Sequence, residues 1–291
     1  MKSLVLKSPA KLNLHLRILR RRPDGYHDLL TVFHRISLCD TIRIRKTRGD
    51  FRLTTNLPGL ETGEGNLITK AYRLLQARFP DLGGVSVRLD KKIPPGAGLG
   101  GGSSNAAHFL LGMKKMFRLG IPETELLKMG KKLGADVPFF LLDTSQAMAW
   151  GIGEKMRVLP PGRKLSFLLL LTDQGLNTKK VYQNIRPPQR PLSLTEEKRV
   201  AIILNSFFGD QRIGEAARLV RNDLEPSAFS LRPQVRKAIQ ALKAAGALCV
   251  LMSGSGPTVF AVLSSRKEAG VLARRLKTHP LPYRKSVCHT F

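Results

Sequence analysis

A dense run of glycines is the feature that most constrains how this chain can fold. Five glycines fall within the seven positions 96–102, after Pro94 and Pro95 and before two serines and an alanine-rich segment of helical periodicity. Glycine lets backbone N–H groups approach a ligand closely and adopts positive φ without strain. A helix that begins directly after such a loop directs its unpaired N–H groups and its positive dipole end to the same place. The sequence therefore predicts a strand, a polyphosphate-binding loop and a helix in succession, which indicates a nucleoside triphosphate as ligand.

This loop differs from other glycine-rich nucleotide-binding motifs. It contains no G-x-x-x-x-G-K-[ST] pattern, so it is not a P-loop. Gly96, Gly98 and Gly101 match G-x-G-x-x-G, but a dinucleotide-binding fold needs another strand about 20 residues later that ends in an acidic residue. Residues 120–134 favour a helix instead. A eukaryotic-type kinase loop needs a valine two positions after the third glycine, where this chain has Ser103.

Composition narrows the range of partners and locations. The net charge is +28, but the basic residues are spread along the 291-residue chain and no aromatic pattern interleaves them, so we expect no specific nucleic-acid partner. No run of 18 apolar residues and no signal-peptide core occurs, so we expect no membrane span and a cytoplasmic location. Cys39, Cys249 and Cys288 fit neither a disulfide framework nor a zinc site. The oligomeric state is expected to be a monomer or a homodimer.

Hydropathy patterns predict an α+β chain with a β-rich start. Strands are expected at 3–7, 11–19, 31–38, 41–46, 84–90, 145–150, 155–159, 165–172, 247–252 and 257–263. Helices are expected at 66–79, 103–116, 122–133, 194–206, 211–222, 232–245 and 266–276. Asp24-Gly25 is a turn signal, and residues 186–191 are predicted to form a proline-rich loop. A shift in composition near residue 155 predicts two domains, 1–155 for ATP binding and catalysis and 156–291 on the substrate side.

Four segments, in order along the chain, resemble motifs of the GHMP kinases, a family that includes galactokinase, homoserine kinase and mevalonate kinase. The loop 95–107 resembles the phosphate-binding motif of that family. The segments Ser8–Leu14 with Asp24–His27, Gly134–Phe140 and Leu251–Phe260 are similar to motifs of one branch, whose members phosphorylate a cytidine diphosphate sugar alcohol. The resemblance implies a two-domain α+β fold, with a ribosomal-protein-S5-like nucleotide-binding domain followed by a ferredoxin-like α/β domain. It also implies ATP and Mg²⁺ as cofactors.

The resemblance further implies a reaction, the transfer of the ATP γ-phosphoryl group to the 2-hydroxyl of that sugar alcohol in the non-mevalonate route to isopentenyl diphosphate. Such a transfer needs an aligned hydroxyl, a group that takes its proton, and positive charge near the moving phosphoryl group. Asp136 would be the base, and Lys11 would lie beside it and stabilise negative charge. On the residues alone, Asp136 could instead be a structural aspartate and Lys11 a surface lysine at a strand start.

The remaining candidate residues form a nucleotide set and a substrate set. Candidate ATP-binding residues are Pro94, Pro95, Gly96, Ala97, Gly98, Leu99, Gly100, Gly101, Gly102, Ser103, Ser104, Asn66 and Leu67. Candidate substrate-binding residues are Asn13, Tyr26, His27, Tyr182, Gly254 and Ser255. Base–aromatic stacking is worth about 1–3 kcal/mol, so Tyr26, with Tyr182 on the other face, would select a cytosine base, and His27 would read its edge. Ser103 and Ser104 could help to hold Mg²⁺ or could cap the helix. Either Lys91 or Lys92 could contact the nucleotide, and no residue is assigned as a dedicated metal ligand.

Two other functions remain open from the sequence. The chain could be another GHMP small-molecule kinase, of the homoserine or mevalonate type, whose substrate offers no base for an aromatic ring to stack on. It could also be an RNA-associated protein that retains an ATP-binding fold. That function would require RNA binding that persists at about 0.2 M salt, where non-specific contacts weaken steeply.

Overall fold

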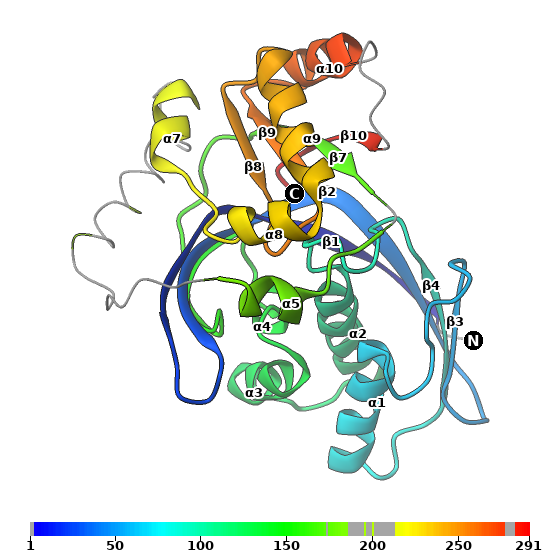
Figure 1. Ribbon diagram of the computed structural model, residues 1–291. Coiled ribbons are helices and arrows are strands. Elements are labelled where there is room, and N and C mark those ends of the chain that lie inside the picture. Colours follow the sequence, from blue (N-terminus) through cyan, green and yellow to red (C-terminus); the bar gives the residue numbers. More distant parts are fainter. Residues whose placement is uncertain (1–2, 173, 186–194, 196–199, 201–212, 277–282) are drawn as a thin grey trace. The chain divides into compact units, whose positions relative to one another are not determined.

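The computed structural model describes residues 3–172, 174–185, 195, 200, 213–276 and 283–291 (Figure 1). The chain divides into two compact units, each of them discontinuous in sequence. Unit 1 comprises the residues up to Ala10, Leu38–Ile93 and Gly100–Asp143. Unit 2 comprises Lys11–Ser37, Pro94–Leu99 and the residues from Thr144 onward. The domain boundary expected near residue 155 stays a prediction.

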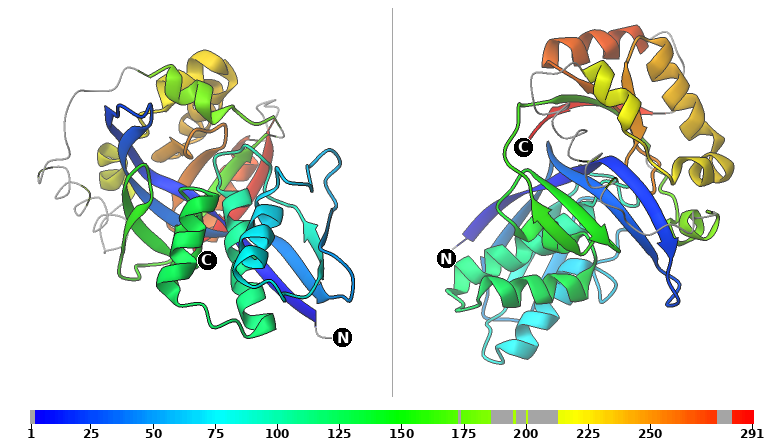
Figure 2. Two further views of the ribbon diagram at one scale, coloured as in Figure 1. Left: turned by 90° about the horizontal axis from the view of Figure 1, so that it is seen from below. Right: turned by 90° about the vertical axis from the view of Figure 1, so that its left-hand side faces the viewer.

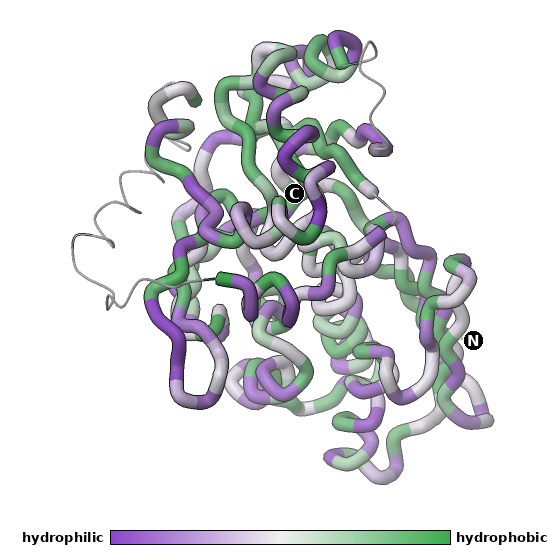
Figure 3. The backbone as a smooth tube through the Cα atoms, viewed as in Figure 1, coloured by the Kyte–Doolittle hydropathy of each residue, from purple (hydrophilic) through white to green (hydrophobic). Residues whose placement is uncertain are grey.

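Two long strands, β1 (Ser3–Arg21) and β2 (His27–Lys46), replace the four shorter strands expected at the start of the chain. Apolar alternation is lost in the middle of β1 because every residue from Ser8 to Leu16 is buried, whichever way its side chain points. The turn between the strands lies where the sequence predicts it: Gly25 has φ +84°, and the backbone N–H of Tyr26 donates to Asp24 Oδ1 at 3.1 Å. The tip of this hairpin is hydrophilic (Figure 3).

Unit 1 combines a small sheet with four helices. The second half of β2 pairs antiparallel with β4, which in turn pairs parallel with β3. Helix α2 packs against the other three helices. Gly112 of α2 allows the helix and the sheet to pack closely. A Cβ at this position would lie only 2.6 Å from Leu6 Cδ1 and 2.9 Å from Ile44 Cδ1. The elements are β3 (Arg52–Thr55), α1 (Leu67–Arg78), β4 (Val85–Asp90), α2 (Gly101–Phe117), α3 (Glu123–Leu133) and α4 (Val137–Leu141). The sequence predicts all of these except β3 and α4, which are too short to show a period.

The strands of unit 2 form two sets. The first half of β2 pairs with β5 (Gln146–Gly151), which pairs with β6 (Lys155–Val158). A second sheet is antiparallel throughout, in the order β10-β7-β9-β8. Its strands are β7 (Ser166–Leu171), β8 (Cys249–Met252), β9 (Val259–Leu263) and β10 (Arg284–His289). Numbered along the chain, the order is 4-1-3-2, the split βαβ arrangement of ferredoxin-like domains, so the predicted α+β fold is confirmed.

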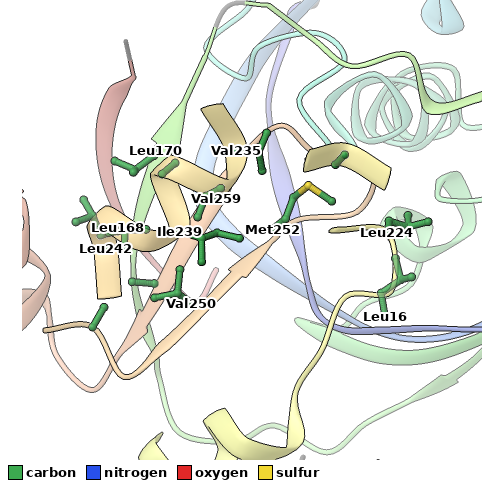
Figure 4. Packing of buried hydrophobic residues seen from close by; sticks show 14 of the residues in the cluster. Leu16, Leu168, Leu170, Leu224, Val235, Ile239, Leu242, Val250, Met252 and Val259 are labelled. Carbon is green, nitrogen blue, oxygen red and sulfur yellow. The ribbon is translucent and has the colours of Figure 1, made fainter. Parts of the chain in front are cut away.

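The helices of unit 2 are α5 (Thr178–Gln183), α7 (Ile213–Leu219), α8 (Glu225–Leu231), α9 (Pro233–Ala244) and α10 (Arg266–Arg275). Helices α9 and α10 cover the same face of the four-stranded sheet (Figure 2). The core under them is a cluster of buried aliphatic side chains, including Leu168, Leu170, Ile239, Val250 and Val259 (Figure 4). The sequence predicts both ends of α9 and α10 to within one residue, but it does not predict α5, α8 or β10.

The loop 186–191 and almost all of the helix 194–206 lie outside the described residues. The helix expected at 211–222 is wrong at its end, because α7 stops at Leu219 and Asn222 instead forms a parallel bridge with Leu16. Within the described part of the chain, no helix combines the length and the apolar character needed to cross a bilayer.

Two buried histidines should make folding pH-dependent. Burial lowers the pKa values of His15 and His34 from 6.5 to about 4, with Arg221 and Arg17 adding to the effect at His15. Between pH 6.5 and 4 the unfolded chain therefore binds more protons than the folded one, and the free energy of unfolding should fall as the pH drops through this window. The loss should reach at most about 3 kcal/mol per histidine. Urea titrations at pH 7.5 and 5.0 would measure it, and His34→Gln should reduce the difference. Equal free energies of unfolding at both pH values would contradict the expectation.

Candidate active site

The glycine-rich loop owes its glycines to backbone conformation and to close packing. Gly96, Gly98 and Gly100 all have φ between +64° and +75°. A Cβ on Gly98 would lie 2.1 Å from the carbonyl oxygen of Ser253 and 3.0 Å from the backbone nitrogen of Gly256. Residues with a side chain rarely adopt such φ values, and at Gly98 a side chain would not fit. The loop therefore packs its backbone directly on a second glycine turn in unit 2.

Four consecutive carbonyl oxygens of the loop, from Gly96 to Leu99, accept hydrogen bonds from protein donors. Gly96 O accepts from Leu176 N, Ala97 O from Thr258 N and Leu99 O from Lys11 N, at distances of 3.3, 3.4 and 2.9 Å. Gly98 O accepts from Ser253 Oγ at 2.9 Å. Carbonyl oxygens repel anions, and these four are turned toward the protein. The loop is therefore suited to present N–H groups rather than oxygens to a phosphate.

Helix α2 starts two residues earlier than the sequence predicts. Its N-cap is Gly100, with no side-chain cap, so the interpretation of Ser103 or Ser104 as the cap is wrong. Ser104 is fully buried and its hydroxyl lies 2.8 Å from Ser8 Oγ. Ser103 is half-buried, and its Oγ lies 4.0 Å from the position that a Cβ on Gly134 would take. Ser103 is thus the first-turn hydroxyl that lies near the segment of Asp136.

A buried carboxylate anchors the chain where β4 leads into the loop. Asp40 is fully buried, and its Oδ1 accepts from the backbone N–H groups of Lys92 at 2.7 Å and Ile93 at 2.9 Å. Its Oδ2 accepts from Lys91 Nζ at 2.5 Å and Asn105 Nδ2 at 2.9 Å. Lys91 is thereby committed to a buried ion pair, whereas Lys92 is exposed. Of the two lysines that the sequence leaves open, Lys92 is the better candidate for a nucleotide contact.

Asn66 and Leu67 lie at the start of α1 in unit 1. The Asn66 side chain caps this helix by accepting from Ile68 N at 2.9 Å and donates to Glu61 O at 2.7 Å. Leu67 Cδ1 lies 3.6 Å from the position that a Cβ on Gly102 would take. The structure therefore brings Leu67 to the first turn of α2, while the Asn66 carboxamide is occupied in local structure.

Asp136 is the N-cap residue of the short helix α4 in unit 1. The following residues Val137–Leu141 are all buried, and α4 packs on α2 and α3. Phe140 contacts Phe139 and His108, with ring centroids 5.2 and 6.4 Å apart. This apolar anchor fixes the position of a carboxylate that is itself half-buried.

Lys11 and Asn13 lie on the same face of β1 in unit 2, two residues apart, as the strand period predicts. Both are at least 96% buried. Lys11 Nζ donates to Asn13 Oδ1 at 2.6 Å, and Asn13 Nδ2 donates to Thr31 Oγ1 at 2.8 Å. Lys11 Nζ also lies 5.2 Å from the centroid of the Phe33 ring. The ammonium group is thus held in one orientation by a carboxamide and an aromatic face.

The second glycine turn reaches this lysine. A Cβ on Gly254 would lie 3.2 Å from Asn13 Oδ1 and 3.4 Å from Lys11 Nζ. The neighbouring Ser255 Oγ lies 2.9 Å from Thr178 Oγ1 at the start of α5. The structure therefore brings together four predicted residues of unit 2: Lys11, Asn13, Gly254 and Ser255. Lys11 and Asp136 belong to different units, and their expected proximity stays a prediction.

Two of the three predicted aromatic residues are also brought together in unit 2. The rings of His27 and Tyr182 have centroids 5.5 Å apart and planes inclined at 38°. Burial, with a smaller contribution from Arg21, lowers the pKa of His27, so its imidazole is neutral at pH 7. Tyr26 lies on the hairpin with 61% of its surface exposed.

Some residues around these sites carry no sequence signal that we recognised. Asp40 lies 65 residues before Asn105, its partner within the loop motif, and Asn222 acts on a turn 30 to 32 residues away. The one hint is at Asp40, a carboxylate in the mostly apolar stretch Leu38–Ile42. No cluster of three or more His, Cys, Asp or Glu side chains suited to a metal ion occurs in the part of the chain that the structure describes. The half-buried Asp136 and the nearby Ser103 fit Mg²⁺, which keeps several waters and binds largely through substrate phosphates.

Comparison with known proteins identifies the family of the chain. Residues 66–144 match the GHMP kinases N terminal domain, and residues 204–280 match the GHMP kinases C terminal model. The chain is 41% identical over 270 residues to a 4-diphosphocytidyl-2-C-methyl-D-erythritol kinase of Pelobacter propionicus, covering 92% of each. It is also similar to a crystal structure of 4-(cytidine 5'-diphospho)-2C-methyl-D-erythritol kinase, with TM-score 0.80, 32% identity and 98% of both chains covered. A homoserine kinase from Cytophaga hutchinsonii has TM-score 0.74 at 18% identity, covering 100% of this chain and 95% of that one, which shows a shared fold.

Substituting Gly98 should damage the loop selectively. Gly98→Ala places a Cβ against Ser253 O at a residue with φ +75°, so we expect a loss of about 1–3 kcal/mol in the free energy of unfolding and at least a tenfold weaker affinity for ATP. Gly120→Ala is the matched control, because nothing lies within 4 Å of its Cβ position, and it should change stability by less than about 0.5 kcal/mol. Thermal melts and nucleotide titration would measure both. Equal behaviour of the two variants would contradict the expectation.

Proposed function

Because the chain belongs to the GHMP kinases, in the branch of the 4-diphosphocytidyl-2-C-methyl-D-erythritol kinases, we propose that it phosphorylates 4-diphosphocytidyl-2-C-methyl-D-erythritol with ATP. The acceptor would be the 2-hydroxyl group, and the products would be the 2-phosphate and ADP, in the non-mevalonate route to isopentenyl diphosphate. The observation that carries this proposal is 41% identity over 92% of the chain to a relative of that name. A cytoplasmic location and a monomeric or homodimeric state remain predictions.

The loop and the start of α2 would bind the triphosphate of ATP. The carbonyl oxygens from Gly96 to Leu99 already accept hydrogen bonds from protein donors, which favours presenting N–H groups rather than these oxygens to the anion. The N-terminus of α2 adds unpaired N–H groups and a positive dipole end. Lys92 and the Ser103 hydroxyl are the side chains best placed to assist. Asp136 and Ser103 would help to hold Mg²⁺, which would bind largely through the phosphates and would supply positive charge near the transferred group.

Asp136 would accept the proton of the acceptor hydroxyl. A tertiary hydroxyl is hindered and weakly acidic, so a fixed carboxylate helps to orient it and to remove its proton. The buried residues that follow Asp136 hold this carboxylate in place. Lys11, oriented by Asn13, would stabilise the negative charge that develops as the phosphoryl group moves.

The His27–Tyr182 pair would recognise the cytosine base. An aromatic face next to a base contributes about 1–3 kcal/mol of binding free energy, whatever the base. Specificity for cytosine needs hydrogen bonds, and a neutral imidazole offers one donor and one acceptor. The lowered pKa of His27 supports this neutral form. Tyr26, exposed on the hairpin, would add a second aromatic surface.

Turnover of a panel of alcohols tests the assignment directly. The purified chain is incubated with ATP and Mg²⁺, and ADP release is followed with 4-diphosphocytidyl-2-C-methyl-D-erythritol, homoserine, mevalonate or galactose as acceptor. We expect ADP with the cytidylyl substrate alone, because the other alcohols offer no base to bind. Faster turnover of another alcohol would show that the proposed substrate is wrong, while the assignment as a kinase would stand. ATP binding without turnover of any alcohol would favour a non-catalytic function.

Asp136→Asn should abolish turnover while leaving ATP binding nearly intact. The carboxamide keeps the shape of the side chain but cannot accept the proton, so kcat should fall at least about a hundredfold. The affinity for ATP, titrated without Mg²⁺, should change less than about twofold. Asp143→Asn, which removes the same charge from an exposed residue, is the control and should keep wild-type kinetics. Substantial turnover by Asp136→Asn would mean that Asp136 is structural.

A further inference from the structure

The segment after α7 runs beside the strand that carries Lys11 and Asn13. Leu16 N donates to Arg221 O at 2.8 Å, and Asp223 N donates to Leu16 O at 3.0 Å. The backbone N–H of Ile18 donates to the Asp223 carboxylate at 2.9 Å. Leu16 and Leu224 belong to the same buried cluster and lie next to each other in Figure 4. Within unit 2, the backbone of this segment therefore pairs with the backbone of β1.

Asn222, in the middle of that segment, uses its whole carboxamide. It is 95% buried. Its Nδ2 donates to Met252 O at 2.7 Å and to Gly254 O at 2.8 Å, and its Oδ1 accepts from Leu224 N at 2.9 Å. An uncharged side chain with two donors and an acceptor at this short length is found only in asparagine. The two donors fix both carbonyl groups at the entry to the second glycine turn.

That turn contacts the residues proposed to act in catalysis. The Cβ position of Gly254 is within 3.4 Å of Lys11 Nζ, Asn13 Oδ1 and Gly98 O. Gly254 has φ +54°, and no side chain of its own locks this conformation. A change in the orientation of the Gly254 peptide group would therefore shift the side chain of Lys11 and the backbone of the glycine-rich loop. The carboxamide of Asn222 donates to the backbone of the turn, so it would act through the turn.

We propose that Asn222 is a positioning residue for phosphoryl transfer, which holds the Met252–Gly254 backbone in the orientation that places Lys11 and the glycine-rich loop. The proposal rests on the proposed kinase function. Its mechanism is the pair of hydrogen bonds from one carboxamide to two carbonyl groups. It assigns no contact between Asn222 and substrate, and it predicts a loss in kcat that exceeds what loss of stability alone would cause.

The first test compares two variants of unit 2 that remove buried side-chain atoms. Asn222→Ala removes both hydrogen bonds to the turn. Leu272→Ala removes apolar contacts from α10 in the core cluster, away from the turn. Both should lower Tm. With ATP and 4-diphosphocytidyl-2-C-methyl-D-erythritol, at a temperature well below both Tm values, Asn222→Ala should lower kcat more than tenfold, while Leu272→Ala should stay within about twofold of wild type.

The second test uses pH as a readout that a purely structural role would not move. In Asn222→Asp, the ionised carboxylate has no donor and faces two carbonyl oxygens, whereas the neutral acid can donate to one of them. Burial raises the pKa of such a carboxyl, so lower pH restores part of the donor function. The ratio of kcat for this variant to wild-type kcat should therefore rise at least about threefold between pH 8.0 and 6.0, under conditions where both remain folded.

The outcomes separate this proposal from the proposed function. If the wild-type chain does not phosphorylate the cytidylyl substrate, the function itself is wrong. If wild type is active and Asn222→Ala loses no more kcat than Leu272→Ala, or if the kcat ratio of Asn222→Asp does not change with pH, the positioning role is overturned. It is also overturned if neither Asn222 variant folds, because Asn222 is then a structural residue.

Discussion

The organisation of the glycine-rich region depends on one buried carboxylate. Asp40 accepts four hydrogen bonds, two from consecutive backbone N–H groups and two from the side chains of Lys91 and Asn105. These bonds fix the point at which β4 gives way to the loop, and they tie that point to the second turn of α2. An isolated buried charge costs several kcal/mol, and only complete pairing of this kind makes it tolerable. Loss of one of these hydrogen-bond partners would therefore displace the two segments of unit 1 that flank the loop, the end of β4 and the start of α2.

The sequence predicts the parts of the structure that are governed by local rules. Strong helical periods identify α1, α3, α9 and α10, and the glycine run identifies the loop and the helix after it. The predictions fail where distant contacts decide. The middle of β1 is buried throughout, which erases the alternation that marks a half-buried strand. The segment after Leu219 leaves the helix because its backbone finds partners on Leu16, some 200 residues earlier in the chain.

The candidate site follows the same division. Glycine and aspartate motifs, read through resemblance to the GHMP kinases, predict Lys11, Asn13 and Gly254, which the structure brings together in unit 2. The residues that hold them carry no such signal. Asp40 and Asn222 each pair with groups that folding alone makes their neighbours, so no spacing rule could find them. The motifs therefore identify the side chains of the candidate site. Buried polar residues outside these motifs determine how the side chains are positioned.

The inward-facing carbonyls of the glycine-rich loop have a consequence for binding thermodynamics. Five glycines would ordinarily make this segment flexible, and a nucleotide would have to order it at a cost in conformational entropy. Here donors on Lys11, Leu176, Ser253 and Thr258 impose that order during folding. Nucleotide affinity is thereby coupled to residues as far as 160 positions from the loop. Loss of the Ser253 hydroxyl, the side-chain donor among the four, would lower affinity mainly through an unfavourable entropy of binding.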